Sequence, residues 1–183
     1  MTEAPVVIVP YDPSWPIQFE AERDILTRAL SAWLVGPIVH IGSTAVPGLA
    51  AKPIIDIMAG VRTLADSQPA IAAAGELGYS YAPYRPDEEH WFCKPSPQVR
   101  THHLHLVPLG SSLWRQSLAF RDYLRAHPGL AAEYEALKRQ LAEEHRFDRE
   151  AYTQAKGPFI ARVTAVALSQ PDQAIAERDR RRG

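Results

Sequence analysis

The chain has 183 residues, which is enough for one domain with a sizeable hydrophobic core. Its 20 Lys plus Arg nearly balance its 21 Asp plus Glu, which argues against binding along an extended nucleic acid, and its single cysteine excludes an internal disulfide. No apolar run approaches the roughly 20 residues that span a bilayer, and no basic segment opens a secretory signal, so we expect a cytoplasmic protein without membrane contact.

The first 110 residues show the pattern of a sheet with helices around it. In chain order we predict a strand at 6–9, a helix opening at 12–15, strands at 38–41 and 54–58, a helix at 64–77, and strands at 79–84, 91–94 and 101–107. Phe19, Leu26 and Leu30 recur near helical spacing, which gives the first helix an apolar stripe. Gly78 is typical of the residue that follows a helix.

After residue 110 the pattern becomes helical. Helices are predicted at 111–126, 129–147 and 149–168, the last of them broken at Gly157–Pro158 because proline cannot continue the hydrogen-bond ladder. Residues 171–183 are polar and arginine-rich and are expected to fray. Strands first and helices later predict one α+β domain over residues 1–183, a mixed β-sheet covered by helices with a helical C-terminal part at 111–170.

A carboxylate interrupts the apolar strand at 54–58. Asp56 stands between Ile55 and Ile57, and burying an ionised carboxylate is unfavourable unless a cation or several donors accompany it. The strand at 101–107, THHLHLV, carries three histidines that can supply ring nitrogens. Asp56 therefore indicates a metal site, or else a structural pair with an arginine such as Arg100 or a capped turn.

Strand alternation decides which of these side chains share a face. His103 and His105 point to one side of their strand and Leu104 to the other, so Asp56 can meet both histidines if the two strands are neighbours. One oxygen and two imidazole nitrogens suit zinc, manganese, nickel or iron, and magnesium less well because it prefers oxygen. The alternative is that His103 and His105 form only a half-exposed surface pair.

A turn that could hold phosphate follows the strand at 38–41. Gly42, Ser43 and Thr44 can direct backbone N–H groups and two hydroxyls at one point, an arrangement that phosphate oxygens accept well. Gly-Ser turns are common, so this signal alone is weak. Lys52, which precedes the Asp56 strand, has the pattern of a solvated loop residue.

Several segments together resemble the GrpB-like family: HIGSTAVPGLAAKPIIDI, FCKP, HHLHLV, FRDYLR and YTQAK. The resemblance runs from about residue 6 to about residue 168. It places the chain in the nucleotidyltransferase-fold superfamily, which includes DNA polymerase beta. It implies a nucleotidyltransferase-like mixed sheet, a phosphate-binding Gly-Ser turn, and a following strand that carries a pair of metal-binding carboxylates.

The resemblance also assigns roles to particular residues. Gly42 and Ser43 match the phosphate-binding turn, and Asp56 matches the first metal-binding carboxylate, which makes it the expected catalytic residue. The second carboxylate should stand at position 58, where this chain has Met58. His103 and His105 occupy the strand where a third carboxylate is expected, so we expect a one-metal site in place of the usual two-magnesium arrangement.

Cationic side chains occur in the helical motifs of the resemblance. Arg121, Lys138 and Lys156 stand at positions that resemble family motifs, and we expect them to contact phosphate or to close over the substrate. The alternative is an ion pair in a helix interface for Arg121 and a solvated helix face for Lys156.

These features favour a metal-dependent nucleotidyltransferase, or a related phosphoryl-transfer protein, that acts on a nucleotide or another phosphorylated small molecule. The expected cofactor is a divalent metal ion: manganese, magnesium or zinc. The alternative is a catalytically silent nucleotide- or metal-binding module, because Met58 removes a carboxylate that two-metal chemistry uses. A less favoured third hypothesis is a hydrolase in which Asp56 and the histidines activate water.

Overall fold

A five-stranded sheet forms the centre of the molecule. The computed structural model describes residues 4–170, and its strands are β1 Leu34–Ile41, β2 Ile55–Val61, β3 Ser80–Tyr81, β4 His90–Pro95 and β5 Arg100–Pro108. They lie side by side in the order β1-β2-β5-β4-β3. β2 and β5 are parallel and the other neighbours are antiparallel, so the expected mixed sheet is confirmed.

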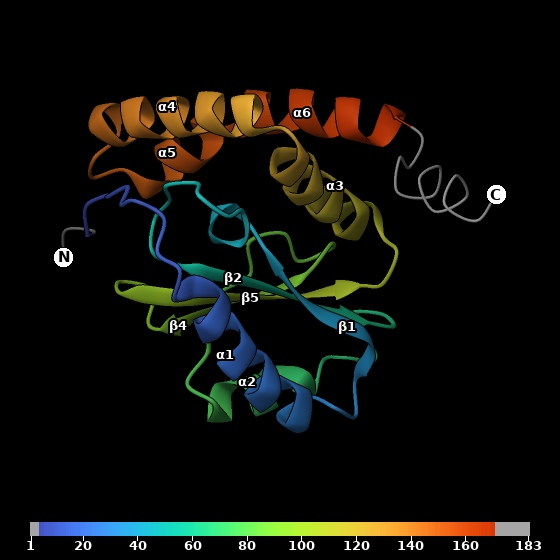
Figure 1. Ribbon diagram of the computed structural model, residues 1–183. Coiled ribbons are helices and arrows are strands. Elements are labelled where there is room, and N and C mark those ends of the chain that lie inside the picture. The colour runs from blue at the N-terminus through green and yellow to red at the C-terminus, as the bar shows by residue number, and fades with distance from the viewer. Residues whose placement is uncertain (1–3, 171–183) are drawn as a thin grey trace.

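Helices cover both faces of this sheet (Figure 1). One face carries α1 Trp15–Ala29 and α2 Ala70–Glu76, and the other carries α3 Ser112–Ala126, α4 Pro128–Glu144, α5 Arg149–Ala155 and α6 Gly157–Ser169. The break between α5 and α6 falls at Lys156, one residue before the predicted Gly157–Pro158, and the proline lies in the first turn of α6. Among the described helices, none is long and apolar enough to cross a membrane. The predicted tail at 171–183 lies outside the described residues.

The two faces of the central strands differ in chemistry. Ile55, Ile57 and Leu104 point into the main core beneath α1 and α2. On the opposite face Met58 packs with Trp114 of α3 and with other apolar side chains. This second face also carries Asp56, His103 and His105, and it is covered by the C-terminal helices instead of being open to solvent.

Three predicted elements differ from the structure. The strand at 6–9 is reduced to one bridge between Val9 and Ala51, because Val6 donates instead to the Arg146 carbonyl and is buried beneath α4. The helix at 64–77 begins only at Ala70, since turns around Thr63 occupy the preceding residues. The strand at 79–84 keeps two residues, because the loop that follows contains prolines and leaves the sheet.

Other bounds shift by a few residues. β1 starts earlier than predicted, at Leu34, and an irregularity in its pairing between Leu34 and Ile38 lets it pass Gly36 and Pro37. β2 runs on to Val61. Helix α4 ends at Glu144, before the predicted end at 147.

Candidate functional site

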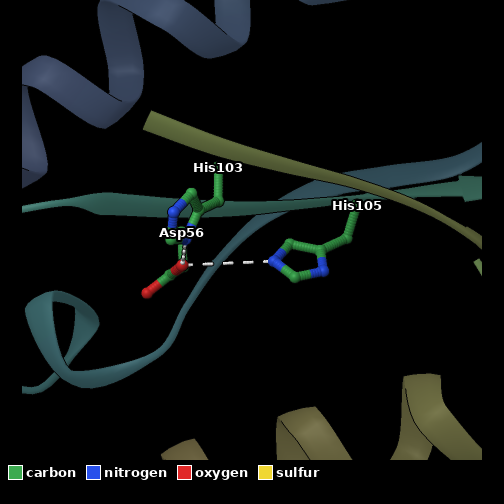
Figure 2. A group of neighbouring side chains, drawn as sticks. All are labelled: Asp56, His103 and His105. Atoms are coloured by element: carbon green, nitrogen blue, oxygen red, sulfur yellow. Dashed lines mark hydrogen bonds and ion pairs between the residues drawn. The ribbon is translucent and has the colours of Figure 1, made fainter. Parts of the chain in front are cut away.

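Asp56 and two histidines form a compact cluster at the centre of the sheet. Asp56 of β2 lies directly opposite His103 of the parallel strand β5, and the next pair on the same face is Met58 with His105. The Nδ1 atom of His103 is 2.8 Å from Asp56 Oδ1, and the Nε2 atom of His105 is 4.0 Å from the same oxygen (Figure 2). Each residue offers one ligand atom, and these atoms lie within 4.8 Å of one another.

Gly42 makes room for the Asp56 carboxylate. A Cβ atom at position 42 would stand 2.3 Å from Asp56 Oδ2, far inside van der Waals contact. Gly42 also has φ = +71°, a conformation that L side chains rarely adopt. The glycine of the turn is therefore required by the carboxylate beside it, whether or not the turn binds phosphate.

Replacing Gly42 by Ala is expected to destabilise the protein by about 2 kcal/mol or more, because backbone strain at positive φ adds to the clash with Asp56. Gly48→Ala is the matched control, since Gly48 has φ = +79° and nothing lies within 4 Å of its added Cβ. Urea denaturation of both variants measures the difference. Equal losses of stability would show that the Asp56 contact has no energetic weight.

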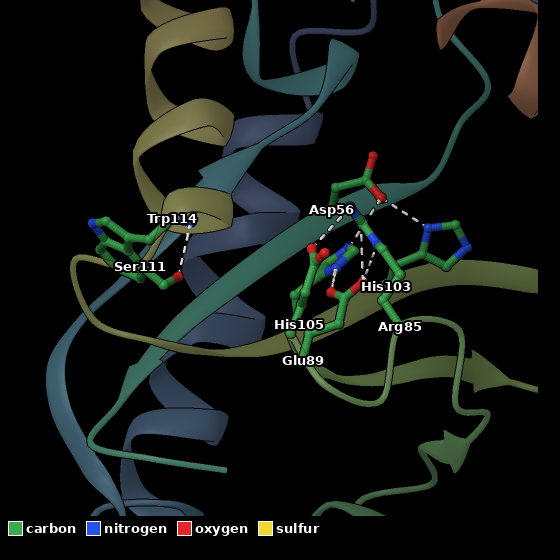
Figure 3. A network of polar contacts seen from close by, with 8 residues as sticks. Asp56, Arg85, Glu89, His103, His105, Ser111 and Trp114 are labelled. Atoms are coloured by element: carbon green, nitrogen blue, oxygen red, sulfur yellow. Dashed lines mark hydrogen bonds and ion pairs between the residues drawn. The ribbon is translucent and has the colours of Figure 1, made fainter. Parts of the chain in front are cut away.

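A buried carboxylate is hydrogen-bonded to His105. Glu89, which immediately precedes β4, is 0% exposed, and its Oε2 accepts from Nδ1 of His105 at 2.5 Å. Its other oxygen is held by the Arg85 guanidinium at 3.1 Å (Figure 3). A carboxylate on one ring nitrogen fixes the tautomer and the orientation of an imidazole, so Nε2 of His105 is the atom presented toward Asp56.

Contacts within this cluster shift the pKa values of its side chains. Burial alone would raise the pKa of Asp56, but hydrogen bonds and charge from His103 and His105 lower it well below the usual carboxylate range. Burial alone would lower the pKa of His105, yet Asp56 and Glu89 together raise it to about 9. Burial lowers the pKa of His103, with Asp56 opposing the shift. Asp56 is thus ionised at neutral pH, and a metal ion at Nε2 of His105 would displace a proton.

The cluster lies in the wall of a cavity of about 480 Å³. Ser43 and Thr44 line it near Asp56, and helix α5 and its flanks contribute Arg149 and Tyr152. Three lysines line the same cavity: Lys52, Lys138 and Lys156. Carboxylate and imidazole groups therefore share one cavity with three lysines, a combination that suits an anionic ligand together with a metal ion.

The other expected phosphate ligands have different surroundings. The Thr44 hydroxyl donates to the Ile54 carbonyl and contacts Nε2 of the buried His40, which ties the turn to β1 and β2. Arg121 lies outside the main cavity, in a shallow second hollow, where it donates to the His40 carbonyl and pairs with Asp122. The structure thus does not bring Arg121 together with Asp56.

Lys138 is almost fully buried, at 1% exposure. Its Nζ donates to the carbonyl of Ala50 and lies 4.9 Å from the centre of the Tyr134 ring. Its charge reaches the cavity, but its ammonium is already engaged by the loop that leads to β2.

Two side chains that line the cavity are not predicted by the sequence. Glu89 has no spacing signal, because its contact with His105 depends on the antiparallel register of β4 and β5. Lys52 was interpreted as a solvated loop residue, whereas the structure half-buries it in the cavity wall. Apolar residues flank Lys52 on both sides in the sequence, and this pattern is a signal for burial of its side chain.

Position 58 has no polar function in this fold. Met58 is 0% exposed and packs with Ile41, Val107 and Trp114. A carboxylate there would face an apolar cluster instead of the cavity. The Glu89 carboxylate also lines the cavity, and it is bound to His105.

The fold and cluster define an α+β protein with a mixed sheet and an Asp-His site beneath C-terminal helices. Residues 5–165 match the family model described as GrpB protein, and the chain belongs to this family. The UPF0157 protein PA4798 of Pseudomonas aeruginosa is 40% identical over 168 residues, covering 90% of this chain and 68% of that protein. The crystal structure of GrpB from Enterococcus faecalis is 35% identical, with a TM-score of 0.80, and the match covers 88% of this chain and 97% of that one.

A more distant relative is larger. A protein of Mycolicibacterium paratuberculosis named dephospho-CoA kinase is 29% identical over 185 residues, a match that covers 87% of this chain and 45% of that protein. The similar region is therefore less than half of the kinase.

Proposed function

We propose that the protein binds a nucleotide, or another phosphorylated small molecule, and catalyses metal-dependent phosphoryl or nucleotidyl transfer. Asp56, His103 and His105 would hold one divalent metal ion. The observation that carries this proposal is the convergence of three ligand atoms within 4.8 Å in the wall of a cavity that lysines also line. Placement in the nucleotidyltransferase-fold superfamily is part of the same proposal.

The residues present fit such an ion. Two imidazole nitrogens and one carboxylate oxygen are a donor set that suits manganese or zinc better than magnesium. Glu89 supplies the supporting hydrogen bond that metal-ligating histidines almost always have. His103 Nε2 is buried without a hydrogen-bond partner, so the ring has one unsatisfied nitrogen in this arrangement.

Other residues of the cavity would bind and orient the phosphate and stabilise its charge. A bound divalent ion supplies a Lewis acid that neutralises charge on a phosphoryl oxygen. Gly42 and Ser43 would orient a phosphate through backbone N–H groups and a hydroxyl, with Thr44 holding the turn in shape. Lys138 and Lys156 would add positive charge where negative charge develops. Arg121 would support the β1 end through the His40 carbonyl instead of contacting the ligand.

The comparisons offer limited support for nucleotide chemistry. The name of the dephospho-CoA kinase relative indicates phosphoryl transfer in that protein. Because the match covers 45% of it, the kinase activity need not belong to the similar part. The relation nevertheless favours a role for this fold close to a nucleotide-bearing substrate.

A catalytically silent binding module is the second candidate. The buried Met58 in its apolar cluster favours this alternative, because the two-carboxylate arrangement of metal-dependent transfer is missing. Such a module would keep the Asp56 cluster and the cavity for recognition without turnover.

Calorimetry and product analysis separate the two candidates. ATP, GTP, CTP and UTP are each offered with Mn²⁺ and with Mg²⁺, and release of phosphate or pyrophosphate is followed by phosphorus NMR. Binding with release that is lost in Asp56→Asn supports an enzyme. Saturable binding without release supports the silent module, and absence of binding in all eight combinations would contradict a nucleoside triphosphate site in either candidate.

A further inference from the structure

Lysine is rare in this chain, and most of its lysines line one cavity. Only four residues are lysines, namely Lys52, Lys94, Lys138 and Lys156, and the other cationic side chains among the 20 Lys plus Arg are arginines. Three of the four lysines line the cavity that contains Asp56, and the fourth, Lys94, is paired with Glu22. A compact ammonium group behaves differently from the planar guanidinium that the chain uses elsewhere, so the gathering of lysines indicates a specific ligand.

Lys52 and Lys156 are placed against one aromatic ring. The Nζ atom of Lys52 is 4.9 Å from the centre of the Tyr152 ring, and that of Lys156 is 4.5 Å from it. Lys52 comes from the loop before β2, whereas Lys156 follows α5, so the contact joins the sheet to the helical part. Tyr152 is 1% exposed and is held in a small core with α4, which gives both ammonium groups a rigid support.

These two cations have no compensating carboxylate in contact. Within residues 4–170, neither Lys52 nor Lys156 forms an ion pair with an acidic side chain. Burial lowers the pKa of Lys52 to about 7, with the charge of Lys156 adding to the effect, and burial lowers the pKa of Lys156 to about 8; the more distant charge of Asp56 opposes both shifts without forming an ion pair. Two half-buried like charges are unfavourable in the empty protein, and an anionic ligand would relieve both the desolvation and the repulsion.

Lys138 has a different role from these two. Its ammonium is engaged by the Ala50 carbonyl, and its side chain is almost inaccessible. Of the three lysines in the cavity, Lys52 and Lys156 are therefore the two whose ammonium groups can contact a ligand.

We propose that Lys52 and Lys156, supported by Tyr152, form an anion subsite for a polyphosphate chain, so that the natural ligand is a diphosphate or triphosphate compound and not a monophosphate. The proposal rests on the proposed function, in which another phosphate lies at the Asp56 cluster. The sheet supplies that cluster, the loop before β2 supplies Lys52, and the residue after α5 supplies Lys156, so the ligand would contact both the sheet and the helical part. A cavity of about 480 Å³ is much larger than one phosphate group.

The test compares inorganic tripolyphosphate with orthophosphate by calorimetry, first without metal. The wild-type protein is expected to bind tripolyphosphate at least about tenfold more tightly, and Lys52→Gln or Lys156→Gln should each weaken that binding about tenfold, which is typical of one lost charged hydrogen bond. Arg28→Gln is the control, because it removes the same charge from an exposed position on α1, beyond the opposite face of the sheet. Circular dichroism establishes that each variant is folded.

Mn²⁺ binding, followed by electron paramagnetic resonance, keeps this subsite distinct from the metal site. Lysine-dependent tripolyphosphate binding together with failure to bind Mn²⁺ would support the subsite and contradict the proposed metal function. Unchanged Mn²⁺ binding in both lysine variants, with weakened tripolyphosphate binding, supports both. Equal tripolyphosphate affinity in wild type and both lysine variants, or no saturable binding to the folded wild-type protein, would overturn the subsite.

Discussion

Replacing Asp56 by Asn is expected to weaken divalent-metal binding by more than about 100-fold, because loss of a ligand should exceed the 10–100-fold cost of losing an outer hydrogen bond. Asp56 offers the only carboxylate oxygen of the proposed three-residue metal site and is the group on which His103 and His105 converge. Titration with Mn²⁺ under electron paramagnetic resonance, and with Zn²⁺ by calorimetry, measures the change. Unaltered metal stoichiometry and affinity in the variant would remove Asp56 from the site.

A histidine on the same strand provides the control. His102 alternates with His103 along β5, so His102→Gln changes an imidazole that does not share the Asp56 face. Metal binding should be unchanged in that variant. Loss of binding in both variants would point to disruption of β5 and not to removal of a ligand.

The same Asp56 substitution separates binding from folding. In the sequence, an isolated Asp56 among isoleucines predicts an unchanged or raised melting temperature on neutralisation. The hydrogen bond to His103 changes that expectation, because Asn leaves His103 without its anion and leaves His105 with Glu89 alone. We now expect a loss of about 1–3 kcal/mol of unfolding free energy in chelator. Urea denaturation measures it, and a gain of stability would show that Asp56 is a liability in the empty protein.

Replacing Glu89 by Gln is expected to weaken metal binding 10–100-fold, which is typical of outer partners of metal-ligating histidines. The substitution keeps the shape of the side chain but removes its charge. Because Asp56 and Glu89 together raise the pKa of His105 to about 9, loss of one anion should lower that pKa toward the ordinary value of histidine. Metal titration and a proton NMR titration of the His105 ring measure the two effects.

The adjacent Glu88 provides the control for the Glu89 substitution. Glu88 also approaches Arg85, at 3.6 Å, but its side chain is 54% exposed, whereas that of Glu89 is fully buried. Glu88→Gln should leave both metal affinity and the His105 pKa unchanged. If Glu88→Gln and Glu89→Gln behave alike, the effect comes from Arg85 or from net charge, and the role of Glu89 in orienting His105 is wrong.

Local patterns in the sequence carry much of the architecture. Alternation along the strand THHLHLV separates His103 and His105 from Leu104, and the structure keeps that division between the cavity and the main core. The last helices break within one residue of the predicted Gly157–Pro158. These features depend on neighbours within a few residues, so one sequence is enough to expose them.

The edges of the sheet and the residues that line the cavity could be determined only from the tertiary structure. Val6 has the pattern of a strand residue, yet a tertiary hydrogen bond to the Arg146 carbonyl takes its N–H. Burial of Met58 against Trp114 likewise depends on where α3 crosses the sheet. Propensity cannot distinguish these outcomes, because an apolar residue fits equally well in an edge strand and against a helix.

The sequence by itself determined the family resemblance, the mixed sheet with its C-terminal helices, and the shared parity of the two histidines. Only the tertiary structure decided that β2 and β5 are neighbours, that Gly42 gives space to Asp56, and that Glu89 supports His105. It also placed Lys52 beside Lys156, across about a hundred residues of chain. The physical reason is that strand and helix periodicities act over a few residues, whereas charge partners are chosen by which distant segments packing brings together.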